Sequence, residues 1–171
     1  MIYSKKSKLI IPVLVGIIGL LFLPTVVFGQ TKASVYSTWD TLEVDTCATA
    51  WLIKNFVDKN AIFKFYPKGE IISEGIAFDT PDAEFRRTAE FCAFETVINK
   101  YKISDDGVKE IGKLIHEIEI NYWAQEPNSK IVEFKQEVAA VLQASTSSEQ
   151  GFEKTFLMFD KLYADLSLKF K

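Results

Sequence analysis

An uncharged, strongly apolar run over residues 9–28 most limits what this chain can fold into, because it removes the first residues from the globular part. Three lysines precede the run and small residues around Gly29 follow it, which is the plan of a secretory signal peptide. We expect cleavage of residues 1–29, with Gln30 as the new N-terminus. The remaining roughly 140 residues suit one domain.

A retained membrane anchor is the alternative, since a helix of about twenty residues nearly spans the roughly 30 Å core of a bilayer. Pro12 and Pro24 weaken a long helix, and the small residues before Gln30 favour cleavage. In both cases the lysines stay inside and the domain is exported to the periplasm or the extracellular space. We expect membrane contact only through the N-terminal segment before cleavage.

The charge of the exported part argues against one class of partner. Residues 1–29 contain three lysines and no acidic residue, so 17 basic and 23 acidic side chains remain, a net charge of −6 with histidine neutral. This balance does not suit a nucleic-acid binder, and we expect no nucleic-acid partner.

After a linker over residues 30–37, the pattern predicts an α+β domain over residues 38–171. We expect a small sheet of short strands in the N-terminal half, packed with four to five helices that lie mostly in the C-terminal half. The predicted strands cover 38–44, 61–66 and 75–79, and the predicted helices cover 46–57, 93–101, 105–122, 130–144 and 150–169.

Polar residues at the expected helix starts predict the caps. Asp45 is the expected N-cap of the helix 46–57, and Ser104 that of the helix 105–122. Ser147 or Ser148 begins the last helix, and Ser147 with Gln150 has the spacing of a capping box.

The two cysteines, Cys47 and Cys92, both lie in the exported part, where a disulfide can persist. A Cys47–Cys92 bridge is one alternative, and two small buried hydrophobic residues is the other. Neither cysteine belongs to a zinc-type cluster.

Five short blocks, spread over residues 39–166, resemble together the pattern of one family. They are Val44-Asp45 with Ala48 and Trp51-Leu52-Ile53; Ala77-Phe78-Asp79; Glu84-Phe85 with Cys92-Ala93-Phe94-Glu95; His116-Glu117-Ile118-Glu119; and Phe159-Asp160-Lys161-Leu162-Tyr163-Ala164. In this order they resemble the C-terminal domain of ChrB, among the chromate-resistance proteins. The resemblance implies an exported, stand-alone protein of chromate resistance.

The sequence departs from the family pattern at two positions that carry charge. The arginine that the family has after its first aspartate is Thr46 here, and the histidine expected after Glu84-Phe85 is Arg87. If these two family residues form the working site, this chain has a changed or lost one.

A metal site is the first chemical candidate. His116, the single histidine, stands three residues before Glu119, so on a helix both side chains face the same way. Imidazole and carboxylate together suit a divalent transition metal such as iron, manganese or zinc. Asp45 and Glu84, at element boundaries, complete the predicted ligand set, with Asp79 as a further acid. Alternatively, His116 and Glu119 are surface neighbours that share a modest hydrogen bond.

An oxyanion site is the second candidate. Arg86 and Arg87 are the only arginines, and the planar guanidinium matches oxyanions such as chromate or sulfate. Side chains of neighbouring residues in an extended segment point to opposite faces, however, so the pair does not clamp one ligand. The alternative is a salt bridge to Glu84 or Glu90.

We therefore expect an exported, chromate-resistance-like module that binds a metal ion or an oxyanion in stress or metal resistance. A metal-dependent redox enzyme acting on chromate or reactive oxygen is the second hypothesis. A structural or partner-binding domain without a ligand is the third. Convergence of Asp45, Glu84, His116 and Glu119 distinguishes the first hypothesis from the third.

Overall fold

The computed structural model describes residues 34–121 and 129–170, so the predicted signal peptide and the first half of the predicted linker, residues 30–33, lie outside the described residues. The elements in chain order are β1 (Val35–Trp39), α1 (Val44–Leu52), the π-helical turn η1 (Ile53–Val57), β2 (Ile62–Tyr66), β3 (Ile76–Ala77), α2 (Ala93–Tyr101), α3 (Asp106–Glu119), α4 (Ser129–Gln143), α5 (Ser148–Ser167) and the 3₁₀ turn η3 (Leu168–Phe170). The predicted α+β class is confirmed.

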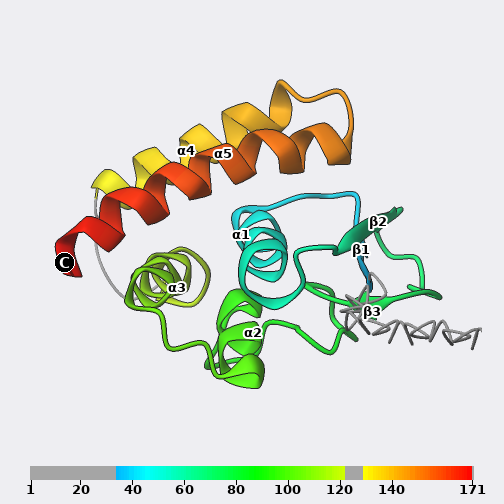
Figure 1. Ribbon diagram of the computed structural model, residues 1–171. Helices are drawn as coiled ribbons and strands as arrows, with labels where there is room; N and C mark the ends of the chain where they lie inside the picture. The colour runs from blue at the N-terminus through cyan, green and yellow to red at the C-terminus, as the bar shows by residue number, and fades with distance from the viewer. Residues whose placement is uncertain (1–33, 122–128, 171) are drawn as a thin grey trace, which may run out of the picture. The chain divides into compact units, whose positions relative to one another are not determined.

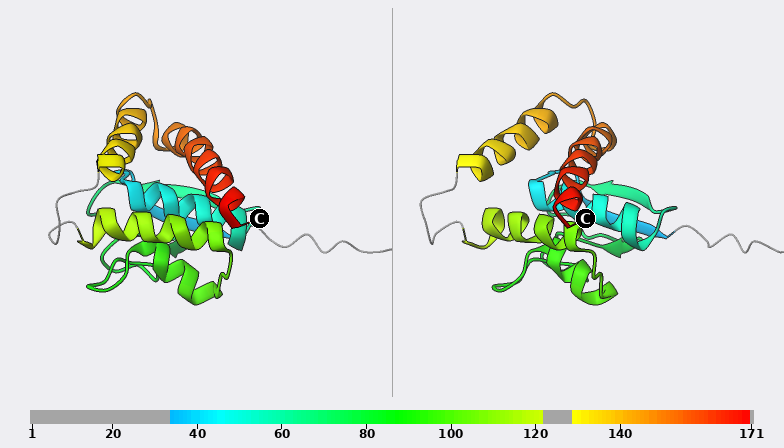
Figure 2. Two further views of the ribbon diagram at one scale, coloured as in Figure 1. Left: turned by 90° about the vertical axis from the view of Figure 1, so that its left-hand side faces the viewer. Right: turned by 60° about the vertical axis from the view of Figure 1, so that its left-hand side comes forward.

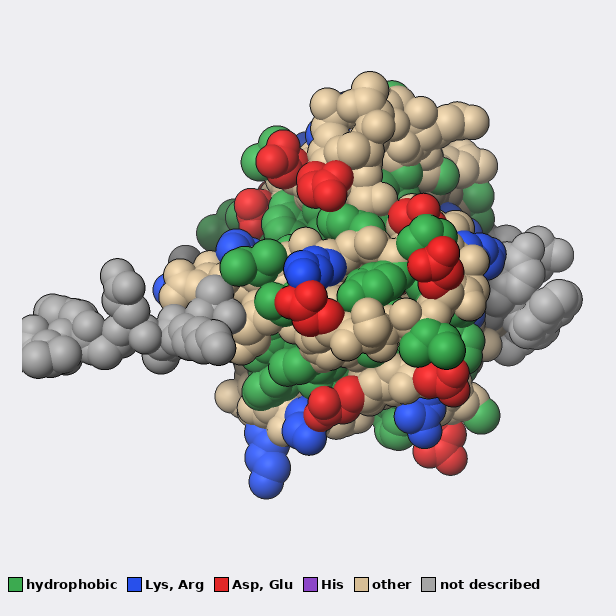
Figure 3. Space-filling view, turned by 90° about the vertical axis from the view of Figure 1, so that its right-hand side faces the viewer, with side chains coloured by type: hydrophobic (Ala, Val, Ile, Leu, Met, Phe, Trp, Pro, Cys, Tyr) green, Lys and Arg blue, Asp and Glu red, His purple; other side chains and the backbone are tan. Residues whose placement is uncertain are grey.

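The sheet is small and parallel, with the strand order β2-β1-β3. Val35 pairs with Ile62 and Tyr36 pairs with Ile76, so β1 is the central strand. α1 connects β1 to β2, because parallel neighbours need a crossover connection. On the face shown in Figure 3, acidic and basic side chains are interspersed.

α1 is the central helix of the fold, and it contacts α2, α3 and α5 (Figures 1 and 2). All of its residues are buried, including the polar Asp45, Thr46 and Thr49. The Trp51 ring packs against Phe159 and Tyr163 of α5, and its Nε1 donates to Asp160 Oδ1 at 2.7 Å. The last predicted block, at residues 159–164, therefore anchors α5 to α1.

The helices and the strands β2 and β3 lie close to their predicted positions, whereas β1 is displaced. α2 has the predicted bounds, and the other three late helices differ from prediction by three residues or fewer at each end. β1, predicted at 38–44, lies instead at Val35–Trp39. Its pairing with β2 ends where Asp40 N donates to Tyr66 O, and the chain then turns into α1.

Two predicted caps are wrong. Glu43, not Asp45, is the N-cap of α1, because Glu43 and Thr46 form the reciprocal bonds of a capping box. Asp105, not Ser104, caps α3, since its carboxylate accepts from Val108 N at 2.9 Å. The predicted Ser147 cap of α5 is confirmed, with its hydroxyl accepting from Gln150 N.

No helix among the described residues is long and apolar enough to cross a membrane.

Candidate functional site

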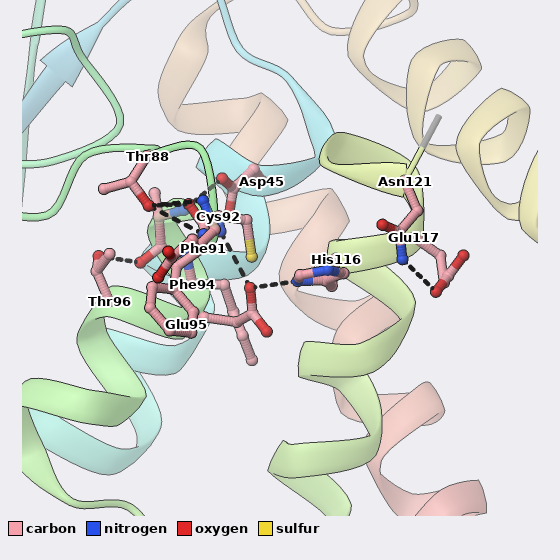
Figure 4. A network of polar contacts seen from close by, with 12 residues as sticks. Asp45, Thr88, Phe91, Cys92, Phe94, Glu95, Thr96, His116, Glu117 and Asn121 are labelled. Carbon is pink, nitrogen blue, oxygen red and sulfur yellow. Dashed lines mark hydrogen bonds and ion pairs between the residues drawn. The ribbon is translucent and has the colours of Figure 1, made fainter. Parts of the chain in front are cut away.

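Asp45 projects from α1 to the N-terminus of α2. Its carboxylate accepts hydrogen bonds from Ala93 N at 2.7 Å and Phe94 N at 2.9 Å (Figure 4), and from the Thr49 hydroxyl at 3.2 Å. Backbone N–H groups at the start of a helix lack intrahelical partners and favour a negative charge nearby. Asp45 therefore caps a helix that begins 48 residues later in the chain.

The same carboxylate is completely buried. Burial raises the pKa of Asp45 to about 6, and the charge of Glu119 adds to this. The N–H groups of Phe94 and Ala93 and the charge of Arg87 act in the opposite direction, because each favours the ionised form. The burial effect is the largest of these.

Asp79, just after β3, is linked to α1 through Thr46. The Thr46 hydroxyl donates to Asp79 Oδ2 and accepts from Glu43 N at 3.3 Å. Asp79 has a positive φ of 49°, a left-handed conformation that is uncommon outside glycine. Burial raises the pKa of Asp79 well above its ordinary value, and the neighbouring charge of Asp45 raises it further.

Glu119 and Arg87 complete the same region. The Arg87 guanidinium lies 2.6 Å from Glu119 Oε2 and 3.8 Å from a carboxylate oxygen of Glu43. The Glu119 side chain is 8% exposed, whereas that of Arg87 is 41% exposed. Burial raises the pKa of Glu119, and Arg87 lowers it. We call Glu43, Asp45, Asp79, Arg87 and Glu119 together the carboxylate cluster.

His116 lies beside this cluster but bonds elsewhere. Its Nδ1 is 2.8 Å from Glu95 Oε2, and the same oxygen accepts from Cys92 N at 3.0 Å (Figure 4). Glu95 is thereby the second acidic side chain at the start of α2. His116 and Glu119, although three residues apart on one helix, have different partners.

The predicted four-residue metal set is not assembled as a unit. Asp45 and Glu119 belong to the carboxylate cluster, whereas His116 bonds to Glu95 and Glu84 forms an ion pair with Lys100 at 2.9 Å. Within residues 34–121 and 129–170, no three His, Cys, Asp or Glu side chains are arranged to hold a metal ion.

The two arginines separate, as expected for neighbours in an extended segment. Arg86 donates through Nη1 to the carbonyl of Ala83 at 3.2 Å, while Arg87 turns to the carboxylate cluster. The expected partners Glu84 and Glu90 are not those of Arg87, because the fold brings Glu119 of α3 next to it.

Cys47 and Cys92 are both buried and free. Burial raises the pKa of each thiol. Of the two alternatives for these residues, the structure has two small buried side chains without a bridge.

Three residues that bond in or beside the carboxylate cluster have no role predicted from the sequence: Glu43, Thr46 and Glu95. Cys92 and Glu95 have the spacing of a capping box, and this spacing could have predicted that Glu95 lies at the start of α2. Thr46 stands where the family has an arginine, and the sequence alone marks it only as a changed position. Both departures from the family pattern, Thr46 and Arg87, in fact contact acidic residues of one cluster.

Comparison with known proteins points to one family. The sequence model of the family described as "ChrB, C-terminal domain" matches residues 36–166. Protein ChrB of Cupriavidus metallidurans is 23% identical over 140 residues, which are 81% of this chain and 42% of that protein. The chain thus spans about two fifths of the length of this curated relative. No solved structure matches.

Proposed function

The chain belongs to the ChrB C-terminal domain family, and from this premise we propose that it is an exported chromate-resistance-like protein that binds a cation at the carboxylate cluster. The proposal has three parts: export, the place of the site, and the class of ligand.

The four predicted ligands do not converge, but a different set of charged residues does, and this second convergence is the observation that carries the proposal. Asp45, Asp79, Arg87 and Glu119 come from four separate sequence blocks, and their charges act on one another in the folded chain. Strongly shifted carboxyl groups and a non-glycine residue with positive φ are features that gather at functional sites.

The class of ligand follows from the charges. The cluster holds four carboxyl groups and one guanidinium, and the pKa values of Asp45, Asp79 and Glu119 are raised, chiefly by burial. An added cation relieves the repulsion among these groups, whereas an oxyanion such as chromate would increase it. Arg87 is the best donor for an oxyanion, but its guanidinium already forms ion pairs with Glu119 and Glu43.

Only two carboxylates, Asp79 and Glu119, would hold the cation, since no three His, Cys, Asp or Glu side chains within residues 34–121 and 129–170 are arranged to hold a metal ion. Asp45 accepts three hydrogen bonds from α1 and α2, which commits it to the helix start. Oxygen donors without imidazole suit manganese better than zinc, and water would complete the coordination. A redox enzyme would need a bound metal and, in addition, an open coordination position for its substrate. Binding alone makes fewer demands on the site, so we prefer the binding function.

The experiment is calorimetry with Mn²⁺, Zn²⁺ and chromate on protein purified without a His-tag, together with metal analysis. We expect Mn²⁺ to bind and Asp79→Asn to weaken it at least tenfold, since asparagine tolerates the left-handed conformation but lacks the charge. Glu84→Gln, which changes an exposed acid outside the cluster, is the matched control and should bind as the wild type does.

Two results would contradict the cation proposal. Binding of chromate without binding of Mn²⁺ would make Arg87 the anchor of an oxyanion site. No binding of any of the three probes would favour a structural or partner-binding domain.

A further inference from the structure

Strand β2 forms one edge of the sheet, since the strand order is β2-β1-β3 (Figure 1). Its inner edge bonds to β1, and Ile62 N donates to Ser34 O at 3.0 Å at the start of this ladder. The backbone groups of successive residues in a parallel strand point to alternate edges. The N–H and C=O groups of Phe63 and Phe65 therefore point outward, and no backbone group within residues 34–121 and 129–170 bonds to them.

The side chains of β2 divide between the two faces of the sheet. Phe63 and Phe65 turn to α5, where their ring centroids lie 5.3 and 5.0 Å from that of Phe152. Ile62 and Tyr66 share the opposite face, and Ile62 is 50% exposed. The fold thus leaves a large apolar side chain of this strand in contact with water.

Lys64 is the charged residue of β2, and a lysine on an edge strand usually discourages pairing with another chain. Its Nζ forms an ion pair with Glu74 Oε2, and the two side chains are 42% and 56% exposed. Both signs of charge are therefore present at the middle of the strand. Lys64 repels a second strand less than a lone lysine would, because Glu74 beside it attracts the lysine of that strand.

The five residues of β2 are self-complementary when a second β2 runs antiparallel to the first. With Lys64 at the two-fold axis, Phe63 lies opposite Phe65 of the second copy, and these outward residues exchange both of their N–H···O=C bonds. Ile62 then lies opposite Tyr66 of the second copy, so an aromatic ring covers the exposed apolar side chain. A second copy of the chain thus satisfies the outer edge with one register.

We propose that β2 pairs antiparallel with β2 of a second copy of this chain, which joins two three-stranded sheets into one continuous sheet. Lys64 of each copy then faces Glu74 of the other as well as its own, so opposite charges alternate at the axis. A five-residue strand buries little surface, and we expect a weak dimer with a dissociation constant of roughly 10–100 µM. The dimer is independent of cation binding, because β2 lies outside the carboxylate cluster.

Sedimentation velocity over a concentration series measures the dimer, and Ile62→Lys tests the strand. The variant places a charge diagonally beside Lys64 of the second copy and removes the contact with Tyr66 on both sides of the axis. The dissociation constant should rise by about tenfold or more. Leu168→Lys is the matched control and should dimerise as the wild type does, since Leu168 is 67% exposed and lies in η3, about 24 Å along the helix from Phe152.

A charge exchange tests the two-fold axis itself. Lys64→Glu brings four carboxylates together at the axis and Glu74→Lys brings four ammonium groups together, so each variant alone should be monomeric. An equimolar mixture should restore the dimer as a heterodimer, because one copy then supplies both negative charges and the other both positive charges. Failure of the mixture to associate, while the wild type dimerises, would overturn the antiparallel register.

Hydrogen exchange on the unaltered protein covers the case in which a variant does not fold. The Lys64 N–H bonds to β1 and should exchange slowly at every protein concentration. The N–H groups of Phe63 and Phe65 should exchange rapidly in dilute protein, because only the second strand bonds to them. Their exchange should slow by about fivefold at a protein concentration roughly ten times the dissociation constant, where about one fifth of the chains remain monomeric.

Three further results would contradict the dimer. A protein that stays monomeric up to about 1 mM does not pair through β2. A dimer that Ile62→Lys and Leu168→Lys weaken equally is formed elsewhere on the molecule. Equal protection of the Phe63 and Phe65 N–H groups at all concentrations would show that another segment of the same chain covers this edge.

Discussion

Asp45 experiences two opposing effects in the folded chain. Complete burial disfavours its charge, whereas the N–H groups of Ala93 and Phe94 favour it. Since burial is the larger effect, its pKa in the folded protein exceeds its value in the unfolded chain. The folded state then holds the Asp45 proton more tightly than the unfolded state does, and this contribution to stability is lost as the pH rises through about 6.

Asp45→Asn should remove this pH dependence. Between pH 3.5 and 7 the free energy of unfolding of the variant should rise relative to the wild type by about 2–3 kcal/mol, since one pKa unit corresponds to roughly 1.4 kcal/mol. Urea denaturation at a series of pH values measures the difference. Parallel curves would show an unshifted pKa for Asp45, and the reverse slope would show that the two N–H groups outweigh burial.

At the level of single elements, helix α5 depends on its first turn as well as on its packing. Phe159 and Tyr163 contact Trp51 in α1, and the Ser147 hydroxyl accepts from Gln150 N. Neighbouring Ser148 instead donates its hydroxyl to the Asp40 carbonyl at 3.4 Å, a long bond at an exposed position. The two serines therefore differ in role, and the capping-box spacing of Ser147 and Gln150 was the sequence signal that separated them.

Ser147→Ala should lower the free energy of unfolding by about 1 kcal/mol, the usual effect of losing an N-cap side chain. Ser148→Ala, the matched control one residue later, should change it by less than about 0.5 kcal/mol. Thermal or urea unfolding of the two variants makes the comparison. Equal effects would show that either serine can cap α5.

The elements also show why some parts of the fold were predictable. α2 and α5 have strong local signals, namely helical periodicity and capping residues, and these act within a few residues of one another. The position of β1 depends on its register with β2, a contact between residues 35 and 62 that no local pattern specifies.

For the whole molecule, the proposed export concerns residues outside the described part of the chain. The order of lysines, an apolar run and small residues supports cleavage before Gln30. Cleavage there would place the domain, with its net negative charge and the carboxylate cluster, outside the cytoplasm.

The full-length chain, produced in a bacterial host, should appear in the periplasmic or secreted fraction with a mass that lacks residues 1–29. Intact-mass spectrometry and N-terminal sequencing check both points. Replacing the three leading lysines by glutamate should reduce export. A full-length mass in the membrane fraction would instead identify a retained anchor.

The sequence by itself determined the family, the α+β class, the helices and the acidic character of residues 30–171, because composition, periodicity and capping are local properties. Only the tertiary structure decided the partners of the charged residues. Asp45 caps α2 instead of α1, His116 turns to Glu95, and Arg87 joins Glu119. Each of these pairs joins residues 21 to 48 positions apart, and packing around α1 brings them together.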